Sequence, residues 1–238
     1  MFIDEKFLRR STGLNVDVEK YCVSTFDEIG DYDAIVALSQ KHGSGRGDHS
    51  FHSPKGGIYL VMRETGLNID AHTLTPAVGL AVHDSVKTVL GRDVGLKWVN
   101  DVMYDGKKIC GILIRSPRRG EYLIGVGVNY ATSPAELEKA GLSDVATSLG
   151  APEDKATAFT ADLMRRIHLA TLAPFDHVRY GKLCVTLGKT VCFNKNGVNI
   201  RGYAESIERD GTLLVRIGMA TVAVDAGEVS LVREVVSH

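Results

Sequence analysis

A loop in the first quarter of the chain combines backbone freedom with a fixed positive charge. Gly43, Gly45 and Gly47 alternate there with Ser44 and Arg46. Glycines let the backbone approach a ligand closely, consecutive N–H groups can face an anion, and a rigid guanidinium suits phosphate or carboxylate. The loop is not a dinucleotide-binding fingerprint, because its spacing is G-x-G-x-G and a strand-like segment follows it in place of a helix. The loop therefore predicts an anion site, with a simple surface connection as the structural alternative.

A second group of polar residues follows a strand-like run near position 100. The run covers residues 94–99, and Asn100 and Asp101 come directly after it. Amide and carboxylate oxygens are ligands that Mg²⁺ accepts in proteins. This strand end is therefore a candidate site for a hard cation.

One lysine stands at the start of an otherwise apolar strand. The Asp105-Gly106 pair favours a hairpin turn, and Lys108 follows it. Strict alternation gives Lys108 three neighbours on one face of the strand, Cys110, Ile112 and Ile114. Because lysine is rare on an apolar face, we expect Lys108 to have a functional role. Gly111 leaves room for a ligand against the backbone.

Strands and helices alternate up to about residue 185 and must position these residues. Hydrophobic periodicity predicts strands over 19–25, 34–38, 57–63, 94–99, 107–115 and 122–129. Helices are expected from Ser24 onwards, over 73–90 with Gly91 as its stop, and over 152–172. After Gly188, turns separate five short strands, over 190–194, 200–208, 212–217, 221–225 and 228–232. This pattern is typical of a small β-barrel.

Composition excludes several classes of protein. The 238 residues are 44% hydrophobic and 24% charged, which is ordinary for a globular chain. A net charge of −1 does not favour nucleic acid or an anionic membrane as a partner. The first residues lack the apolar core of a secretory signal, and no apolar run is long enough to cross a membrane. Four cysteines without a CxxC pair indicate structural thiols, so we expect a cytoplasmic protein.

Taken together, these segments resemble biotin–protein ligases from about Tyr21 onwards. The most specific similarity is that of residues 97–101 and 106–113 to the family's KWPND and GKKxxGIL signatures. Further agreement lies at Ser24-Thr25, at Gln40, and at residues 53–60 and 125–129. The resemblance implies an α+β fold: a mixed or antiparallel sheet with helices, like the catalytic domain of class II aminoacyl-tRNA synthetases, over residues 1–186. A small SH3-like β-barrel would follow over residues 187–238.

The resemblance also implies an activity and its site residues. The enzyme would form biotinyl-5′-AMP from biotin and Mg-ATP, then transfer biotin to a lysine of the biotin carboxyl carrier domain of a biotin-dependent carboxylase. The implied catalytic residues are Lys108, Arg46 and Asp101, with Asp101 also as metal ligand. The implied biotin-binding residues are Ser24, Thr25, Gln40, Gly43, Ser44, Gly45, Arg46, Lys108 and Gly111. The implied ATP-binding residues are Arg46, Phe51, Lys97, Asn100, Asp101, Lys108 and Asn129.

The glycine loop departs from the family pattern GRGRxGR. Ser44, Asp48 and His49 stand where the resemblance implies two arginines and a glycine. A carboxylate and a missing cation beside the adenylate phosphate would weaken its retention. We therefore expect the intermediate to be held less tightly than in a relative with the full loop.

Two other functions agree with parts of the same pattern. One is a lipoate–protein ligase, and the other is a non-catalytic module that binds biotin or a nucleotide. Only about twenty residues precede the first motif, too few for the winged helix-turn-helix with which many bacterial relatives bind DNA. We therefore expect a form without that domain, with no specific DNA binding and no membrane association, as a monomer or homodimer.

Overall fold

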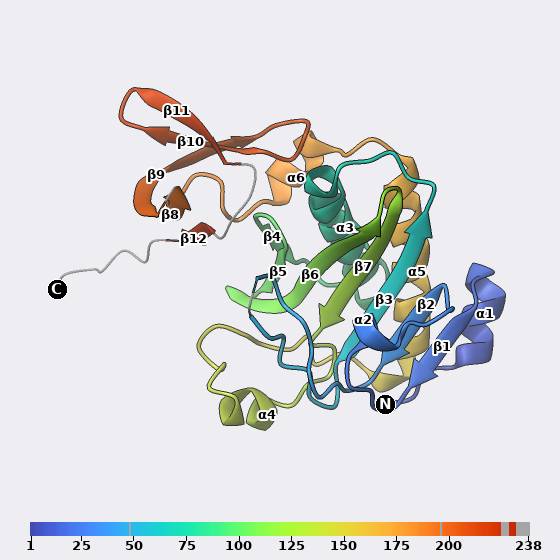
Figure 1. Ribbon diagram of the computed structural model, residues 1–238. Coiled ribbons are helices and arrows are strands. Elements are labelled where there is room, and N and C mark those ends of the chain that lie inside the picture. Colours follow the sequence, from blue (N-terminus) through green and yellow to red (C-terminus); the bar gives the residue numbers. More distant parts are fainter. Residues whose placement is uncertain (48, 196, 225–228, 232–238) are drawn as a thin grey trace.

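A seven-stranded mixed sheet forms the centre of the larger part of the molecule (Figure 1). The computed structural model describes residues 1–47, 49–195, 197–224 and 229–231. The strands are β1 (Val16–Glu19), β2 (Ala34–Ala37), β3 (Ile58–Thr65), β4 (Gly95–Lys97), β5 (Asp101–Tyr104), β6 (Lys107–Arg118) and β7 (Glu121–Val128). Their order is β1-β2-β3-β7-β6-β5-β4. β1 and β2 pair in parallel and the other neighbours are antiparallel, which confirms the expected mixed sheet.

The helices of this part are α1 (Glu5–Thr12), α2 (Thr25–Glu28), α3 (Ala71–Ser85) with a π-helical continuation (Val86–Leu90), α4 (Pro134–Lys139), a 3-10 turn (Glu153–Lys155), α5 (Ala156–Leu172) and α6 (His177–Leu183). The long helices α3 and α5 cover one face of the sheet, whereas the short α2 lies on the other face (Figure 1). α3 and α5 pack on each other and on the sheet, with Leu74, Val78 and Phe159 fully buried between them. Gly91, at φ 67°, ends the long helix as predicted. In the described ranges, no helix is long and apolar enough to cross a membrane.

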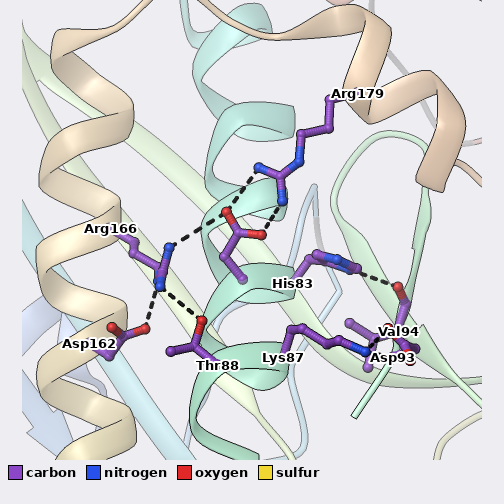
Figure 2. A network of polar contacts seen from close by, with 9 residues as sticks. His83, Lys87, Thr88, Asp93, Val94, Asp162, Arg166 and Arg179 are labelled. Atoms are coloured by element: carbon purple, nitrogen blue, oxygen red, sulfur yellow. Dashed lines mark hydrogen bonds and ion pairs between the residues drawn. The ribbon is translucent and has the colours of Figure 1, made fainter. Parts of the chain in front are cut away.

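Charged side chains join α3, α5 and α6 at the edge of this helical layer. Figure 2 shows Arg166 and Arg179 reaching one carboxylate, that of Asp84. Arg179 Nη1 donates to Asp84 at 2.9 Å, Arg166 Nη1 lies 3.7 Å from it, and Arg166 Nε donates to Asp162 at 2.6 Å. The Asp84 carboxylate of α3 thus ties α6, which leads into the second sheet, to α3 and α5.

The second sheet follows α6 and contains five antiparallel strands. They are β8 (Thr190–Lys195), β9 (Val198–Ile207), β10 (Leu213–Ile217), β11 (Ala220–Val224) and β12 (Val229–Leu231). The order is β11-β10-β9-β8-β12. This confirms the five strands expected after Gly188 and agrees with a small SH3-like module. Val191 and Leu213 belong to the same continuous core as the large sheet.

Trp98 connects the two sheets. Its indole Nε1 donates to the Gly211 carbonyl at 2.9 Å, and its backbone N–H donates to Thr186 Oγ1 at 2.9 Å. The side chain is 3% exposed. The segment before the second sheet also pairs with edge strand β4, because Val185 N–H donates to the Leu96 carbonyl at 2.8 Å.

We expect Trp98→Phe to lower the free energy of unfolding by about 1–3 kcal/mol, because a buried carbonyl at Gly211 loses its donor. Urea denaturation followed by circular dichroism measures the change. Tyr203→Phe is the control, since Tyr203 is 41% exposed and its loss of a hydroxyl should change little. A change under about 0.3 kcal/mol for Trp98→Phe would show that the indole hydrogen bond does not stabilise the junction.

Several predicted elements need correction. The prediction of a strand over 19–25 is wrong, because β1 ends at Glu19 and α2 begins at Thr25. In the segment that joins them, Cys22 forms an isolated β-bridge with Gln40. β5 was not predicted, because it starts directly at the polar Asp101. α1, α4 and α6 were missed as well; each has at most eight residues, too few for a clear periodicity.

Candidate active site

A cavity of about 430 Å³ opens on the sheet face opposite α3 and α5. Side chains of β2, β3 and β7 alternate between the two faces, so one set joins the large core and the other set faces this cavity. The remaining walls come from the glycine loop, α2, the β4–β5 connection and Val229 of the second sheet. The cavity therefore gathers segments that are far apart in the sequence.

Glycines form much of the floor. One row of register partners crosses the sheet through Ala37, Tyr59, Gly127, Gly111 and Asp101. The next row consists of Ile35, Val61, Gly125 and Leu113. A Cβ on Gly127 would lie 2.7 Å from Phe51 Cε1, and one on Gly125 would lie 2.4 Å from Phe26 Cζ. Two aromatic rings thus rest directly on glycine backbone.

A β-bulge in β6 lies directly beside this floor. Val102 of β5 pairs with Cys110, whereas the next residue, Met103, pairs with Lys108. Ile109 is therefore the extra residue in β6. Ile109 and Cys110 are both fully buried in the core on the helical side. At the bulge, two consecutive side chains therefore point into the core.

The bulge turns Lys108 towards the cavity. Strict alternation had placed Lys108 on one face with Cys110, Ile112 and Ile114, and this expectation is wrong because alternation does not continue through a bulge. Lys108 lies on the cavity face with Gly111, where an added Cβ would be 3.2 Å from Lys108 Nζ. The ammonium also lies 5.6 Å from the centre of the Phe51 ring. A lysine on this face reaches a ligand without crossing the core.

Asp101 lies between two lysines in the cavity wall. Its Oδ1 is 2.6 Å from Lys108 Nζ, and its Oδ2 is 3.7 Å from Lys97 Nζ. The Asp101 side chain is only 16% exposed, so these charges are partly shielded from water. One carboxylate therefore offsets two ammonium groups.

Arg46 and Asn100 complete this charged end. Arg46 Nη1 lies 3.4 Å from Asn100 Oδ1, and Asn100 Nδ2 donates to the Ile112 carbonyl at 3.2 Å. The predicted loop arginine is thus beside the predicted cation site. Asn100 and Asp101 supply hard oxygen donors that fit Mg²⁺ when a nucleotide provides the other ligands. The described residues contain no group of three or more His, Cys, Asp or Glu side chains able to hold a metal by themselves.

The opposite end of the cavity is polar but uncharged. The backbone N–H and Oγ1 of Thr25 both donate to Gln40 Oε1 at 2.8 Å, and Gln40 Nε2 donates to Ser53 Oγ at 3.0 Å. Ser24 is the N-cap residue of α2, and its buried hydroxyl has no hydrogen-bond partner among the described residues. The Gln40 amide and the Thr25 hydroxyl, which line the cavity here, are polar groups of the kind that suit a ligand with carbonyl and N–H groups.

The glycine loop is folded by its own close contacts. A Cβ on Gly43 would lie 2.3 Å from the Phe51 carbonyl oxygen, and one on Gly45 would lie 2.7 Å from the His49 carbonyl oxygen. Phe51 N–H donates to the Gly43 carbonyl at 2.7 Å. These two glycines are therefore needed for the shape of the loop itself. Asp48, a departure noted in the sequence, lies outside the described residues.

The cavity contains most of the predicted site residues. Those that line it are Thr25, Gln40, Ser44, Gly45, Arg46, Phe51, Lys97, Asn100, Asp101, Lys108 and Gly111. Ser24, Gly43 and Asn129 do not line it. Asn129 is 5% exposed and its Nδ2 donates to the Thr147 carbonyl at 3.0 Å, beside the bulge.

Sequence reasoning missed several lining residues. Gly125 and Gly127 alternate in a strand, and this alternation was a usable signal for a ligand-facing surface. Phe26 and Val229 carried no such signal.

Two cysteines near the cavity are unreactive thiols. Burial, and to a lesser extent the negative charge of Glu28, raises the pKa of Cys22 to about 12. Burial also raises the pKa of Cys110 well above its usual range.

Comparison with known proteins agrees with this arrangement. Residues 24–129 match the model of the biotin/lipoate A/B protein ligase family. A biotin–[acetyl-CoA-carboxylase] ligase of Mycobacterium tuberculosis is 28% identical over 84% of this chain and 79% of its own length. The corresponding ligase of Paracoccus denitrificans is 27% identical over 82% of this chain and 88% of its own length.

A solved structure has the same fold. The biotin protein ligase from Aquifex aeolicus, in complex with biotin and ATP, aligns with a TM-score of 0.78. The alignment covers 92% of this chain and 99% of the other, at 23% sequence identity. At this coverage, the alignment extends over both sheets of the present structure.

Proposed function

We propose that the chain, which matches the biotin/lipoate A/B protein ligase family over residues 24–129, is an ATP-dependent biotin–protein ligase of that family. The observation that carries the proposal is the place of Lys108, which the β6 bulge turns onto a glycine floor between a polar, uncharged end and a charged end of one cavity. Such a cavity can hold an uncharged ring at one end and two anions at the other. This is the arrangement that joining biotin to ATP requires.

The first step is the formation of biotinyl-5′-AMP. A carboxylate oxygen of biotin attacks the α-phosphorus of ATP, an O–P bond forms, and the bond to the β-phosphate breaks with pyrophosphate as leaving group. Two anions must meet, so fixed cations must offset their repulsion and the charge that builds at phosphorus. Lys108 would bridge the carboxylate and the α-phosphate, with Arg46 beside the same phosphate.

The polar end would hold the ureido ring of biotin. Gln40 is oriented by Thr25 and Ser53, and both Thr25 and Gln40 line this end of the cavity. Asn100 and Asp101 would hold Mg²⁺ together with the phosphates, and this ion would supply charge neutralisation. Lys97 and Phe51 would contact the nucleotide, and Asn129 would support it from behind the bulge.

In the second step, the unprotonated amine of a carrier lysine attacks the acyl carbon of the adenylate. An amide bond forms, the acyl–phosphate bond breaks, and AMP leaves while the amine loses a proton. The proposed acceptor is the biotin carboxyl carrier domain of a biotin-dependent carboxylase, by analogy with the named relatives. We further propose a cytoplasmic monomer or homodimer without sequence-specific DNA binding.

The test measures ATP–pyrophosphate exchange with biotin or lipoate, followed by the mass of a carrier domain incubated with ATP and Mg²⁺. A biotin ligase gives biotin-dependent exchange and a carrier heavier by one biotinyl group. Exchange that requires lipoate would assign the chain to the lipoate branch of the family. Ligand binding without exchange would indicate a non-catalytic module.

Gly127→Ala should lower the rate of biotin-dependent exchange at least about tenfold. Its Cβ would meet three Phe51 ring atoms at 2.7–3.1 Å, so the ring must move into the cavity or away from Lys108. Gly197→Ala is the control, because a Cβ there has nothing within 4 Å, although its φ of 82° costs some stability. If both variants keep the wild-type rate, the Phe51 position does not matter for exchange.

A further inference from the structure

Phe26 closes one side of the cavity at its uncharged end. It is the second residue of α2 and lines the cavity together with Leu113 and Gly125. The ring also packs in a small apolar cluster with Ile35 and Val61, the neighbours of Gly125 in the same row of the sheet. It therefore forms a side wall that stands on the floor of the cavity.

Two contacts hold this ring in place. Atoms Cζ and Cε2 lie 2.4 and 2.5 Å from the point that a Cβ on Gly125 would occupy, so only glycine permits this position of the ring. On the ring face, the guanidinium carbon of Arg115 lies 4.2 Å from the ring centre. A cation at this distance over an aromatic face is attracted to it. The ring is thus fixed by a bare backbone on one side and a charge on the other.

The wall is adjacent to the group that would hold the head of the substrate. Phe26 follows Thr25 directly, and Thr25 donates twice to Gln40. Under the proposed function, on which this step rests, the ureido ring of biotin binds at Thr25 and Gln40. A bicyclic head held there would have the Phe26 ring as a neighbour, because Phe26 adjoins Thr25 in α2 and lines the same cavity.

We propose that Phe26, held by Arg115, is a specificity-determining residue that limits the size of the ring head of the acid. Arg115 is a positioning residue, since it acts on the substrate only through the Phe26 ring. The acid chain and the carboxylate lie towards Lys108, so the wall should affect the choice of head and leave the chemistry at phosphorus unchanged.

The experiment compares the dissociation constants of biotin and of two analogues, each with a methyl group on one ureido nitrogen. Isothermal titration measures them without turnover. In the wild type, we expect the analogue whose methyl group faces the wall to bind at least about tenfold more weakly than biotin. Phe26→Ala should reduce this ratio at least about tenfold, because the methyl group gains room. Phe26→Leu, a smaller change in volume, should reduce it less.

Arg115→Ala should reduce the same ratio by a smaller factor, and Arg115→Lys should restore it, because a lysine keeps a cation over the ring. In the Phe26→Leu background, Arg115→Ala should add nothing further. Phe7→Ala, on α1, is the matched control. A ratio within twofold of wild type in Phe26→Ala, or equal weakening of all three ligands, would overturn the proposal. A wild type that binds no biotin would refute the proposed function instead.

Discussion

Lys108→Ala is expected to lower the rate of biotin-dependent ATP–pyrophosphate exchange at least about a hundredfold. A charge-assisted contact to a developing anion contributes roughly 3 kcal/mol or more to the transition state. The alanine also leaves Asp101 without the ammonium that lies 2.6 Å away, so a carboxylate then repels the phosphates. The loss should appear in the rate of exchange at saturating biotin and ATP, not only in their KM values.

Lys107→Ala is the matched control, because the two lysines are adjacent and of equal charge. Lys107 Nζ donates to the Ser143 carbonyl at 2.5 Å, and Lys107 does not line the cavity. Exchange should therefore stay within about threefold of wild type. If Lys108→Ala also stays within threefold, the lysine that the bulge turns towards the cavity is not the catalytic one.

The contrast between these lysines shows what the sequence could predict and what it could not. The choice of Lys108 followed from its place at the start of an apolar strand and from a signature motif. The direction of its side chain did not follow, because period-two alternation assumes an unbroken ladder. Ile109 and Cys110 are two apolar residues in succession at this point, and both are buried. Such a pair is compatible with a bulge but does not require one. Only the pairing of β6 with β5 shows that the bulge is present and which way Lys108 points.

The outline of the fold was predictable for a similar reason. Long apolar strands, the helix over 73–90 and the turns at Asp105-Gly106 each depend on local sequence, and all of them are present. The walls of the cavity depend on contacts between distant segments. Phe26 is placed by Gly125 and Arg115, and Val229 reaches the cavity from the second sheet. Pairs of this kind have no local pattern, so reasoning along the chain could not find them.

Asp101→Asn should slow biotin-dependent exchange about ten- to a hundredfold and raise the Mg²⁺ concentration needed for half-maximal rate. The substitution keeps the size of the side chain but removes its charge. Two ammonium groups, 2.6 and 3.7 Å from the carboxylate, lose their partner, and a hard oxygen donor becomes a weaker ligand. A net loss equal to one charge-assisted contact, about 1.5–3 kcal/mol, corresponds to the stated range.

A Mg²⁺ titration at saturating ATP separates the two roles of Asp101. If the carboxylate binds the metal, a high Mg²⁺ concentration should restore much of the rate, because mass action offsets a weaker site. If it only orients Lys97 and Lys108, the rate should stay low at every Mg²⁺ concentration. Asp105→Asn, in the turn of the same hairpin, is the control, since Asn adopts a φ of 49° as readily as Asp. An unchanged rate together with an unchanged Mg²⁺ titration would remove Asp101 from the site.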